Sequence, residues 1–145
     1  MTEQLSPLAL QALAVVEESG AIINANHAHP HTIRHKGRID LVTETDIAVE
    51  AFLKERLASL APQAGFLAEE SAEDLSLPDT CWIIDPVDGT TNFAHGLPLT
   101  VTSVAYRLNG EIVLGIVNAP LLHECFIAER EKGHGATGKA SASHP

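Results

Sequence analysis

Basic side chains are scarce in this sequence. It holds nine lysines and arginines against 19 aspartates and glutamates, which gives a formal net charge of −10 at pH 7. Surfaces that bind nucleic acid or an anionic membrane need clustered positive charge. The composition therefore argues against both kinds of partner, and it suits a protein that collects cations.

Cysteine and long apolar runs are also scarce. The two cysteines, Cys81 and Cys125, have no C-x-x-C spacing. Neither a disulfide framework nor a zinc knuckle is expected, and a reducing cytoplasm is the predicted location. No apolar run approaches the ~20 residues that a membrane helix needs. The N-terminus as far as Pro7 carries no basic residue, unlike a signal peptide.

The chain itself has the size and composition of one globular domain. Its 145 residues are 45% hydrophobic, which is enough to bury a core without cross-links. Ser6 followed by Pro7 is typical of a helix start. Apolar residues then recur at spacings of three and four, which predicts a helix that runs to about Ile23.

A second helix is expected from Thr43 to about Leu60, where Pro62 ends it. Thr43 with Asp46 three residues later resembles a capping box. Between the two helices we expect a proline-broken connection and a short hairpin around Lys36-Gly37.

The second half of the sequence is rich in strand patterns. Five short runs read as strands: 65–68, 81–84, 101–108, 111–118 and 124–128. Asn109-Gly110 separates two of them and is a strong hairpin dipeptide. Because helices come first and paired strands follow, the predicted fold is α+β, with two N-terminal helices packed on a largely antiparallel sheet.

Two acids follow the apolar run that begins at Cys81. Asp85 and Asp88 flank Pro86-Val87, and we expect a turn that aims both carboxylates and the Val87 carbonyl at one point. Oxygen ligands of this kind suit Mg²⁺. Residues 89–91, Gly-Thr-Thr, read as the start of a short helix, whose free amides would bind an anion. A plain turn is the alternative reading of the two acids.

Several segments, in order along the chain, resemble the inositol monophosphatase-like family of Mg²⁺-dependent, lithium-sensitive phosphatases. The strongest is Trp82–Phe93, which looks like the signature of that family. The others are Asp40–Asp46, Ala68–Ser71, Gly115–Val117 and Ala128–Ala136. Ala68 stands where the family usually has glycine. The resemblance implies a phosphoric monoester hydrolase that acts on inositol monophosphate or a similar small phosphate.

The family pattern also implies roles for individual residues. The implied metal ligands are Glu69, Asp85, the Val87 carbonyl and Asp88. The implied catalytic residues are Glu69, Thr90 and Asp46, of which Glu69 and Thr90 hold the attacking water. The implied substrate-binding residues are Asp88, Gly89, Thr90 and Thr91. The acidic run after Ala68 could instead be a solvated surface, Asp46 could be only a helix cap, and Lys36 is as readily a surface residue as a site residue.

The resemblance covers residues 1–137 and leaves 138–145 as an expected flexible tail. It implies a further Trp-Asp element with one more aspartate ligand, which this sequence lacks because its one tryptophan is Trp82. We therefore expect the N-terminal part of such a phosphatase. The alternative is a catalytically impaired, truncated homologue that binds cations or a partner. Substrate, metal count and a homodimer stay open.

Overall fold

The computed structural model describes residues 5–28, 37–68, 78–88, 100–131 and 134–140, and it describes side chains at 5–26, 44–67, 78–88 and 100–130. Two helices, α1 (Pro7–Ala28) and α2 (Gly37–Leu60), precede six strands. The strands are β1 (Gly65–Ala68), β2 (Cys81–Asp88), β3 (Val101–Leu108), β4 (Glu111–Ala119), β5 (Glu124–Glu131) and β6 (His134–Ala140). A short 3-10 helix, η3 (Pro120–Leu122), joins β4 to β5.

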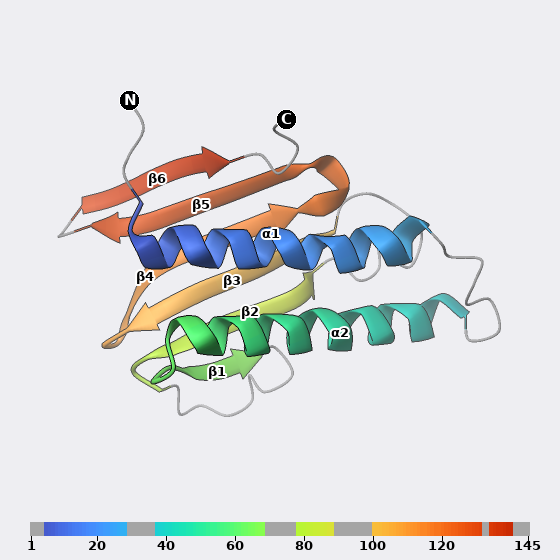
Figure 1. The fold of residues 1–145 in the computed structure, drawn as a ribbon, viewed down its shortest axis with the longest axis horizontal. Helices are drawn as coiled ribbons and strands as arrows, with labels where there is room; N and C mark the ends of the chain where they lie inside the picture. Colours follow the sequence, from blue (N-terminus) through green and yellow to red (C-terminus); the bar gives the residue numbers. More distant parts are fainter. Residues whose placement is uncertain (1–4, 29–36, 69–77, 89–99, 132–133, 141–145) are drawn as a thin grey trace.

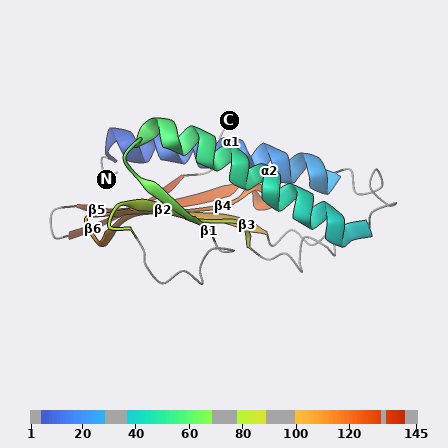
Figure 2. The same cartoon turned by 90° about the horizontal axis from the view of Figure 1, so that it is seen from below.

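The strands form one sheet in chain order, from β1 to β6. β1 and β2 are parallel, and every other neighbouring pair is antiparallel. Both helices lie on the same face of this sheet, so the domain has two layers (Figures 1 and 2). The predicted α+β class, with two helices on a largely antiparallel sheet, is confirmed.

The first helix begins where the sequence predicts. The Ser6 hydroxyl accepts a hydrogen bond from the Ala9 amide at 3.1 Å, which caps the helix. The Glu129 carboxylate of β5 accepts hydrogen bonds from the Ser6 amide at 2.9 Å and the Ser6 hydroxyl at 2.5 Å. These two hydrogen bonds attach the start of α1 to β5 of the sheet. It ends at Ala28, five residues later than predicted and two residues before Pro30.

The second helix corrects two expectations. It starts at Gly37, so the hairpin expected around Lys36-Gly37 is wrong. Thr43 lies inside the helix, so the capping box with Asp46 is wrong as well. The alternation in residues 38–42 is too short to favour a strand over the extension of a helix that has already formed. The end at Leu60 agrees with the prediction.

The strands agree more closely with the sequence. The hairpin of β3 and β4 turns at Asn109 and Gly110, with φ of 53° and 86°, as a type I′ turn requires. β5 continues the meander, as predicted. β6 extends to Ala140 and so takes in the first three residues of the expected tail; residues 141–145 lie outside the described part. β2 is longer than predicted, since it continues through both acids of the motif.

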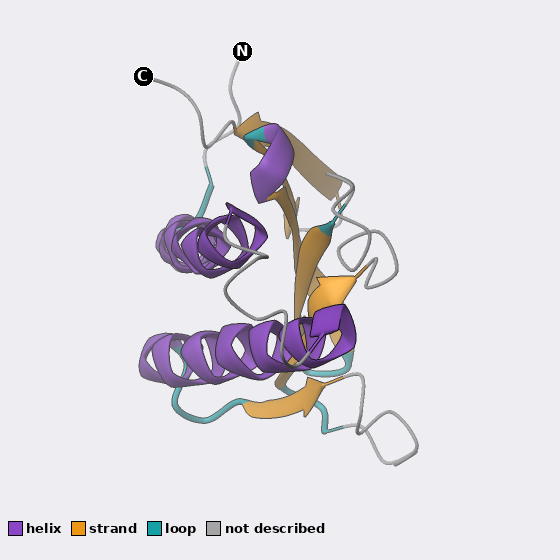
Figure 3. Cartoon of the chain, turned by 90° about the vertical axis from the view of Figure 1, so that its right-hand side faces the viewer, coloured by secondary structure: helices purple, strands orange, loops and turns teal. Residues whose placement is uncertain are grey.

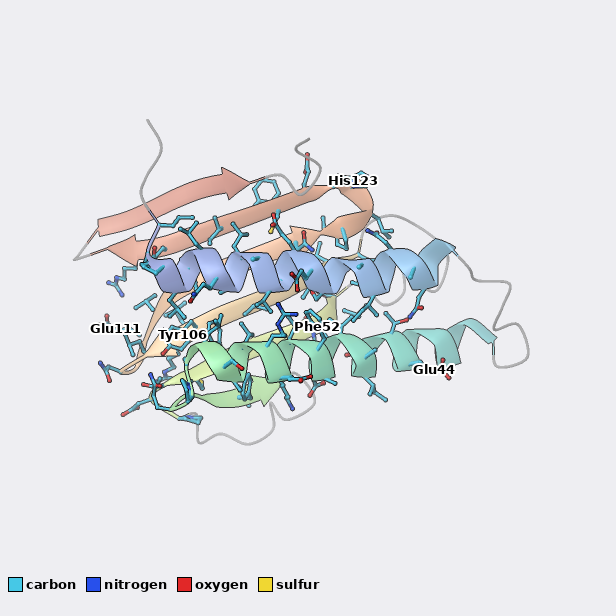
Figure 4. All side chains as sticks on the ribbon, viewed as in Figure 1. Glu44, Phe52, Tyr106, Glu111 and His123 are labelled. Atoms are coloured by element: carbon cyan, nitrogen blue, oxygen red, sulfur yellow. The ribbon has the colours of Figure 1, made fainter. Side chains whose placement is uncertain are left out.

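The core lies between the helices and the sheet. Trp82 and Tyr106 pack against each other there, with ring centroids 4.4 Å apart and ring planes tilted by 39°. Figure 4 labels Tyr106 beside the helix layer. The fully buried side chains from both layers include Val16, Ile23, Val49, Leu53, Leu57, Trp82, Ile84, Val104 and Ile116. Between the helices, the Asn26 amide nitrogen donates a hydrogen bond to the buried Thr45 hydroxyl at 2.7 Å.

The first helix is more apolar than expected. The segment Pro7–Asn26 has a mean hydropathy of 1.3, so it is long and apolar enough to cross a membrane, and this corrects the expectation that no such run exists. In this fold the helix packs against the sheet through buried residues such as Ala12 and Val16. Core helices of soluble proteins and signal sequences near an N-terminus pass the same test.

α1 comes very close to the end of β4 and to η3 at Gly20. A Cβ there would lie 2.8 Å from the Pro120 Cβ and 2.9 Å from the Asn118 side-chain nitrogen. Ser19 and Asn118 both donate hydrogen bonds to the Val16 carbonyl, at 2.6 and 3.4 Å. The helix is therefore held at a separation that only glycine allows.

We expect Gly20→Ala to destabilise the fold. Overpacking costs about 1–3 kcal/mol, and the better helix propensity of alanine offsets about 1 kcal/mol of this. A net loss of up to about 2 kcal/mol would lower Tm by up to roughly 8 °C in thermal unfolding. Gly115→Ala is the matched control, because a Cβ at Gly115 has no heavy atom within 4 Å. An equal Tm for the two variants would contradict the close approach.

Candidate functional site

The two acids of the motif lie on β2 and not in a turn. Asp85 pairs with Ser103 and Asp88 pairs with Val101. Three steps along β2 are therefore matched by two steps along β3, which is the geometry of a β-bulge. The expectation of a turn is corrected, because the strand absorbs the extra residue and keeps its pairing.

The bulge puts both carboxylates on the same face of the sheet. Residues three apart in a regular strand point to opposite faces. Ser103 and Val101 are two apart and share a face, and paired residues share a face too. Asp85 and Asp88 therefore project from the same side. The two side chains thus share a face, and their convergence with the Val87 carbonyl on one point stays a prediction.

Proline and threonine explain why the bulge forms here. Pro86 has no backbone N–H and suits a bulge in an otherwise paired strand. The Thr102 hydroxyl on β3 donates a hydrogen bond to the Pro86 carbonyl at 2.8 Å. Both residues are buried, so this bond satisfies a carbonyl that water cannot reach. The Val87 side chain next to it is buried at 2% exposure.

The acids face away from the helices. Along β3 the residues Thr102, Val104 and Tyr106 are buried under the helix layer, so Val101 and Ser103 point to the other side. No described helix or strand covers that side (Figure 3). We call it the open face and define it by these residues of β2–β5: Ile83, Asp85, Asp88, Val101, Ser103, Ala105, Arg107, Ile112, Gly115, Val117, Phe126 and Ala128. Asp88 is exposed there, whereas Asp85 is half-buried with a fully buried Oδ1.

Asp46 belongs to the other layer. It lies on α2 beside the buried Thr45, half-buried and with a buried Oδ1. The carboxyl end of β2 runs alongside α2 (Figure 1), but α2 covers the face opposite to Asp85 and Asp88. The structure therefore places Asp85 and Asp88 on one face of the sheet and Asp46 in the helix layer on the other.

The remaining predicted site residues lie outside the described residues: Glu69, Gly89, Thr90 and Thr91, together with Lys36. Within the part that the structure describes, no group of three or more histidines, cysteines or acids could hold a metal ion. A site with Asp85 and Asp88 would thus need a ligand from the residues outside it. The roles given to Glu69 and Thr90 stay predictions.

The two cysteines take no part in this chemistry. Both are free and buried. Burial raises the pKa of Cys81, and the positive charge of Arg107 lowers it by less. Burial and the negative charge of Glu17 raise the pKa of Cys125 to about 12. Neither thiol is therefore ionised near neutral pH, as a nucleophile would have to be.

Thr102 is the residue that the sequence analysis missed. The signal for it was Pro86 inside a strand. A bulge that accommodates proline leaves a carbonyl unpaired in the sheet, and a buried carbonyl needs a hydrogen-bond donor. Ser103, which pairs with Asp85 on the open face, was also missed. The strand before the motif was expected to end at Ile84, so no partner was sought for Asp85.

Thr102→Val is expected to destabilise the protein by about 1–3 kcal/mol, because it leaves the buried Pro86 carbonyl without its donor. Thr100→Val is the matched control. Thr100 is also fully buried, but its hydroxyl has no hydrogen-bond partner among the described residues, so its removal should be neutral or stabilising. Chemical denaturation measures both. Equal losses of stability would show that the Thr102 hydrogen bond does not hold the bulge.

The comparisons with known proteins agree on one family. The family model described as "Inositol monophosphatase family" matches residues 4–144. The chain is 43% identical over 129 residues to an inositol monophosphatase of Dictyostelium discoideum, covering 86% of this chain and 47% of the relative. It is 34% identical over 132 residues to Nus factor SuhB of Salmonella typhimurium, covering 89% and 49%.

A solved structure gives the same result. The native crystal structure of the extragenic suppressor protein SuhB from Bartonella henselae superposes with a TM-score of 0.71 at 30% identity, covering 92% of this chain and 52% of that one. This chain thus spans about half the length of the relatives that it matches. The matches across nearly all of its residues show that the chain belongs to the inositol monophosphatase family.

Proposed function

We propose that this chain carries the metal and phosphate site of a Mg²⁺-dependent phosphatase that hydrolyses small phosphate monoesters, with inositol monophosphate as the substrate. The observation that carries the proposal is the bulge in β2, which sets Asp85 and Asp88 on one face at the carboxyl end of the strand. The family supplies the class of reaction, since its named members include inositol monophosphatases.

The donors fit a hard cation. Asp85 and Asp88 offer carboxylate oxygens, and Val87 between them offers a backbone carbonyl, all of which suit Mg²⁺. Members of the family need divalent metal ions. In the proposed site Glu69 joins these ligands. Asp46 lies in the layer on the other face of the sheet, so it is proposed to act on the site only past the carboxyl end of β2, which runs alongside α2 (Figure 1).

The reaction transfers a phosphoryl group to water. Glu69 and Thr90 hold the water in line with phosphorus, and Glu69 accepts its proton as the new P–O bond forms. The amides of Gly89 and Thr90 hold the phosphate oxygens, while Asp88 and Thr91 orient the substrate. The bound cation supplies positive charge against the phosphate and lowers the pKa of water. The ester P–O bond breaks, and the leaving alkoxide takes a proton to give the free alcohol and inorganic phosphate.

The setting of this activity is part of the same proposal. The free, buried cysteines suit a reducing cytoplasm. A net charge of −10 suits a small phosphorylated substrate delivered with a cation better than it suits nucleic acid or a membrane surface. Lithium sensitivity is proposed from the family resemblance alone.

A second candidate function is a catalytically impaired homologue that binds cations or a partner. The observation that favours it is that one relative, 34% identical over 132 residues, is named a Nus factor and not a phosphatase. The two functions differ in turnover: both keep the cation site, and only the first releases phosphate.

Millimolar Mg²⁺ should raise the Tm of this chain. Asp85 and Asp88 repel each other when both are charged, and a cation that binds only the folded state relieves this. At 100 times its Kd such a cation adds about 2.7 kcal/mol of stability. Asp85→Asn should abolish the rise. Glu111→Gln should keep it, because Glu111 lies at the far end of β4, next to the hairpin (Figure 4). An unchanged melting curve in the parent protein would rule out the site.

Phosphate release measures the reaction itself. With Mg²⁺ and inositol monophosphate, Thr90→Ala and Glu69→Gln should each lower kcat about 100-fold or more and change KM by only a few-fold. The reason is that both residues act on the attacking water and not on substrate binding. Assays with a sugar phosphate and a nucleoside monophosphate test the substrate class. Near-normal turnover in either variant would contradict the assignment, and Mg²⁺ binding without any turnover would favour the second function.

A further inference from the structure

Two residues between the acids of β2 are not fixed by the sheet. Among the described residues, Pro86 and Val87 are left out of the pairing of β2 with β3, and Thr102 is the one residue of β3 that lies between the paired positions on either side. The ladder of backbone hydrogen bonds therefore does not hold this dipeptide. Its conformation depends on other restraints.

Both backbone torsions of Pro86 are restrained. Its ring fixes φ at about −65°. Its carbonyl accepts the hydrogen bond from the Thr102 hydroxyl at 2.8 Å, and rotation about ψ would turn the carbonyl away from this donor. Thr102 is 0% exposed, so water does not compete for the bond, and a hydrogen bond in the interior is stronger than one in water.

The next residue is restrained by burial. The Val87 side chain is part of the hydrophobic core, and branching at Cβ limits the rotamers that a valine can adopt. The peptide before Val87 is held by Thr102, and Asp88 after it is again paired, with Val101. The Val87 carbonyl therefore has little freedom to move.

Thr102 is itself held by the core. It lies on β3 between β2 and β4, and it is paired with Asn118 of β4. Asn118 is 1% exposed and donates its hydrogen bond to the Val16 carbonyl of α1 at 3.4 Å. Threonine also has a restricted side-chain torsion. The hydroxyl that restrains Pro86 is thus a fixed donor.

A restrained carbonyl affects which cation a site prefers. Mg²⁺ requires nearly ideal octahedral geometry at about 2.0–2.1 Å, whereas Ca²⁺ accepts irregular ligands at about 2.3–2.6 Å. A ligand that stays in one place can meet the strict requirement of Mg²⁺, and a mobile ligand meets only the looser requirement of Ca²⁺. Residues that orient metal ligands typically change metal affinity by about 10–100-fold when they are removed.

We propose that Thr102 is a positioning residue for the cation. Through the Pro86 carbonyl it holds the Val87 carbonyl and the two acids in one arrangement, and it thereby sets the preference of the site for Mg²⁺ over Ca²⁺. The inference rests on the proposed function, because it uses the cation site of Asp85, Val87 and Asp88. It adds a residue that contacts neither cation nor substrate, since Thr102 faces the helices and the acids face the other side.

Thermal melts over a concentration series of each cation test this inference. The rise of Tm with concentration gives the Kd of the folded state, and each variant is compared with its own metal-free melt. Thr102→Val should raise the Kd for Mg²⁺ about 10–100-fold and the Kd for Ca²⁺ only a few-fold. Thr102→Ser keeps the hydroxyl, so both Kd values should stay within a few-fold of the parent protein. Pro86→Ala frees φ of the restrained residue and should shift the preference in the same direction as Thr102→Val.

Ser6→Ala is the matched control for a loss of stability alone. It removes the cap of α1 and the hydrogen bond to Glu129, and it touches neither the bulge nor the acids. It should lower Tm and leave both Kd values unchanged.

The outcomes separate this inference from the proposed function. If Thr102→Val and Pro86→Ala keep the preference of the parent protein, or if Thr102→Ser loses it as fully as Thr102→Val does, the role of Thr102 is overturned and the cation site stands. If Ser6→Ala changes the preference as much as Thr102→Val, the effect is one of stability and the inference is wrong. A parent protein whose Tm responds to neither cation removes the site and the inference together.

Discussion

The packing of both helices on one face of the sheet is the constraint on which the rest of this structure depends. Trp82, Ile84 and Val104 fill the space between the layers and are almost fully buried. The hydrophobic effect therefore fixes which side of each strand faces inward. Side chains alternate between the two faces of a strand, so the residues of β2–β5 that do not face the helices belong to the open face. These include the two acids and Arg107.

The bulge at Pro86 interrupts this alternation at one point on β2. Without it, Asp85 and Asp88 would lie on opposite faces, one of them under the helices, where an unpaired carboxylate is costly to bury. With it, both carboxylates reach the same side. Thr102 connects the bulge to the core, because its buried hydroxyl donates a hydrogen bond to the Pro86 carbonyl. The candidate site therefore rests on the same core that holds the helices.

The elements that the sequence predicts well depend on local signals. Ser6-Pro7 caps and starts α1, Asn109-Gly110 supports the left-handed turn between β3 and β4, and Pro62 follows the end of α2. Each acts over a few residues, so the tertiary environment has little scope to override it. The hairpin expected around Lys36-Gly37 lacked such a signal, and the helix begins at Gly37 instead.

The sequence alone indicated the residue types of the candidate site: two acids around a proline, after an apolar run, within a family pattern. That pattern indicated the family, and it is the basis of the chemistry proposed for Asp85, Val87 and Asp88. Only the tertiary structure decided that the acids share a face, because this depends on their register against Ser103 and Val101, some 15 residues away in the chain. It also placed Asp46 in the opposite layer. Register and layering are settled by long-range burial, which no local pattern of residues records.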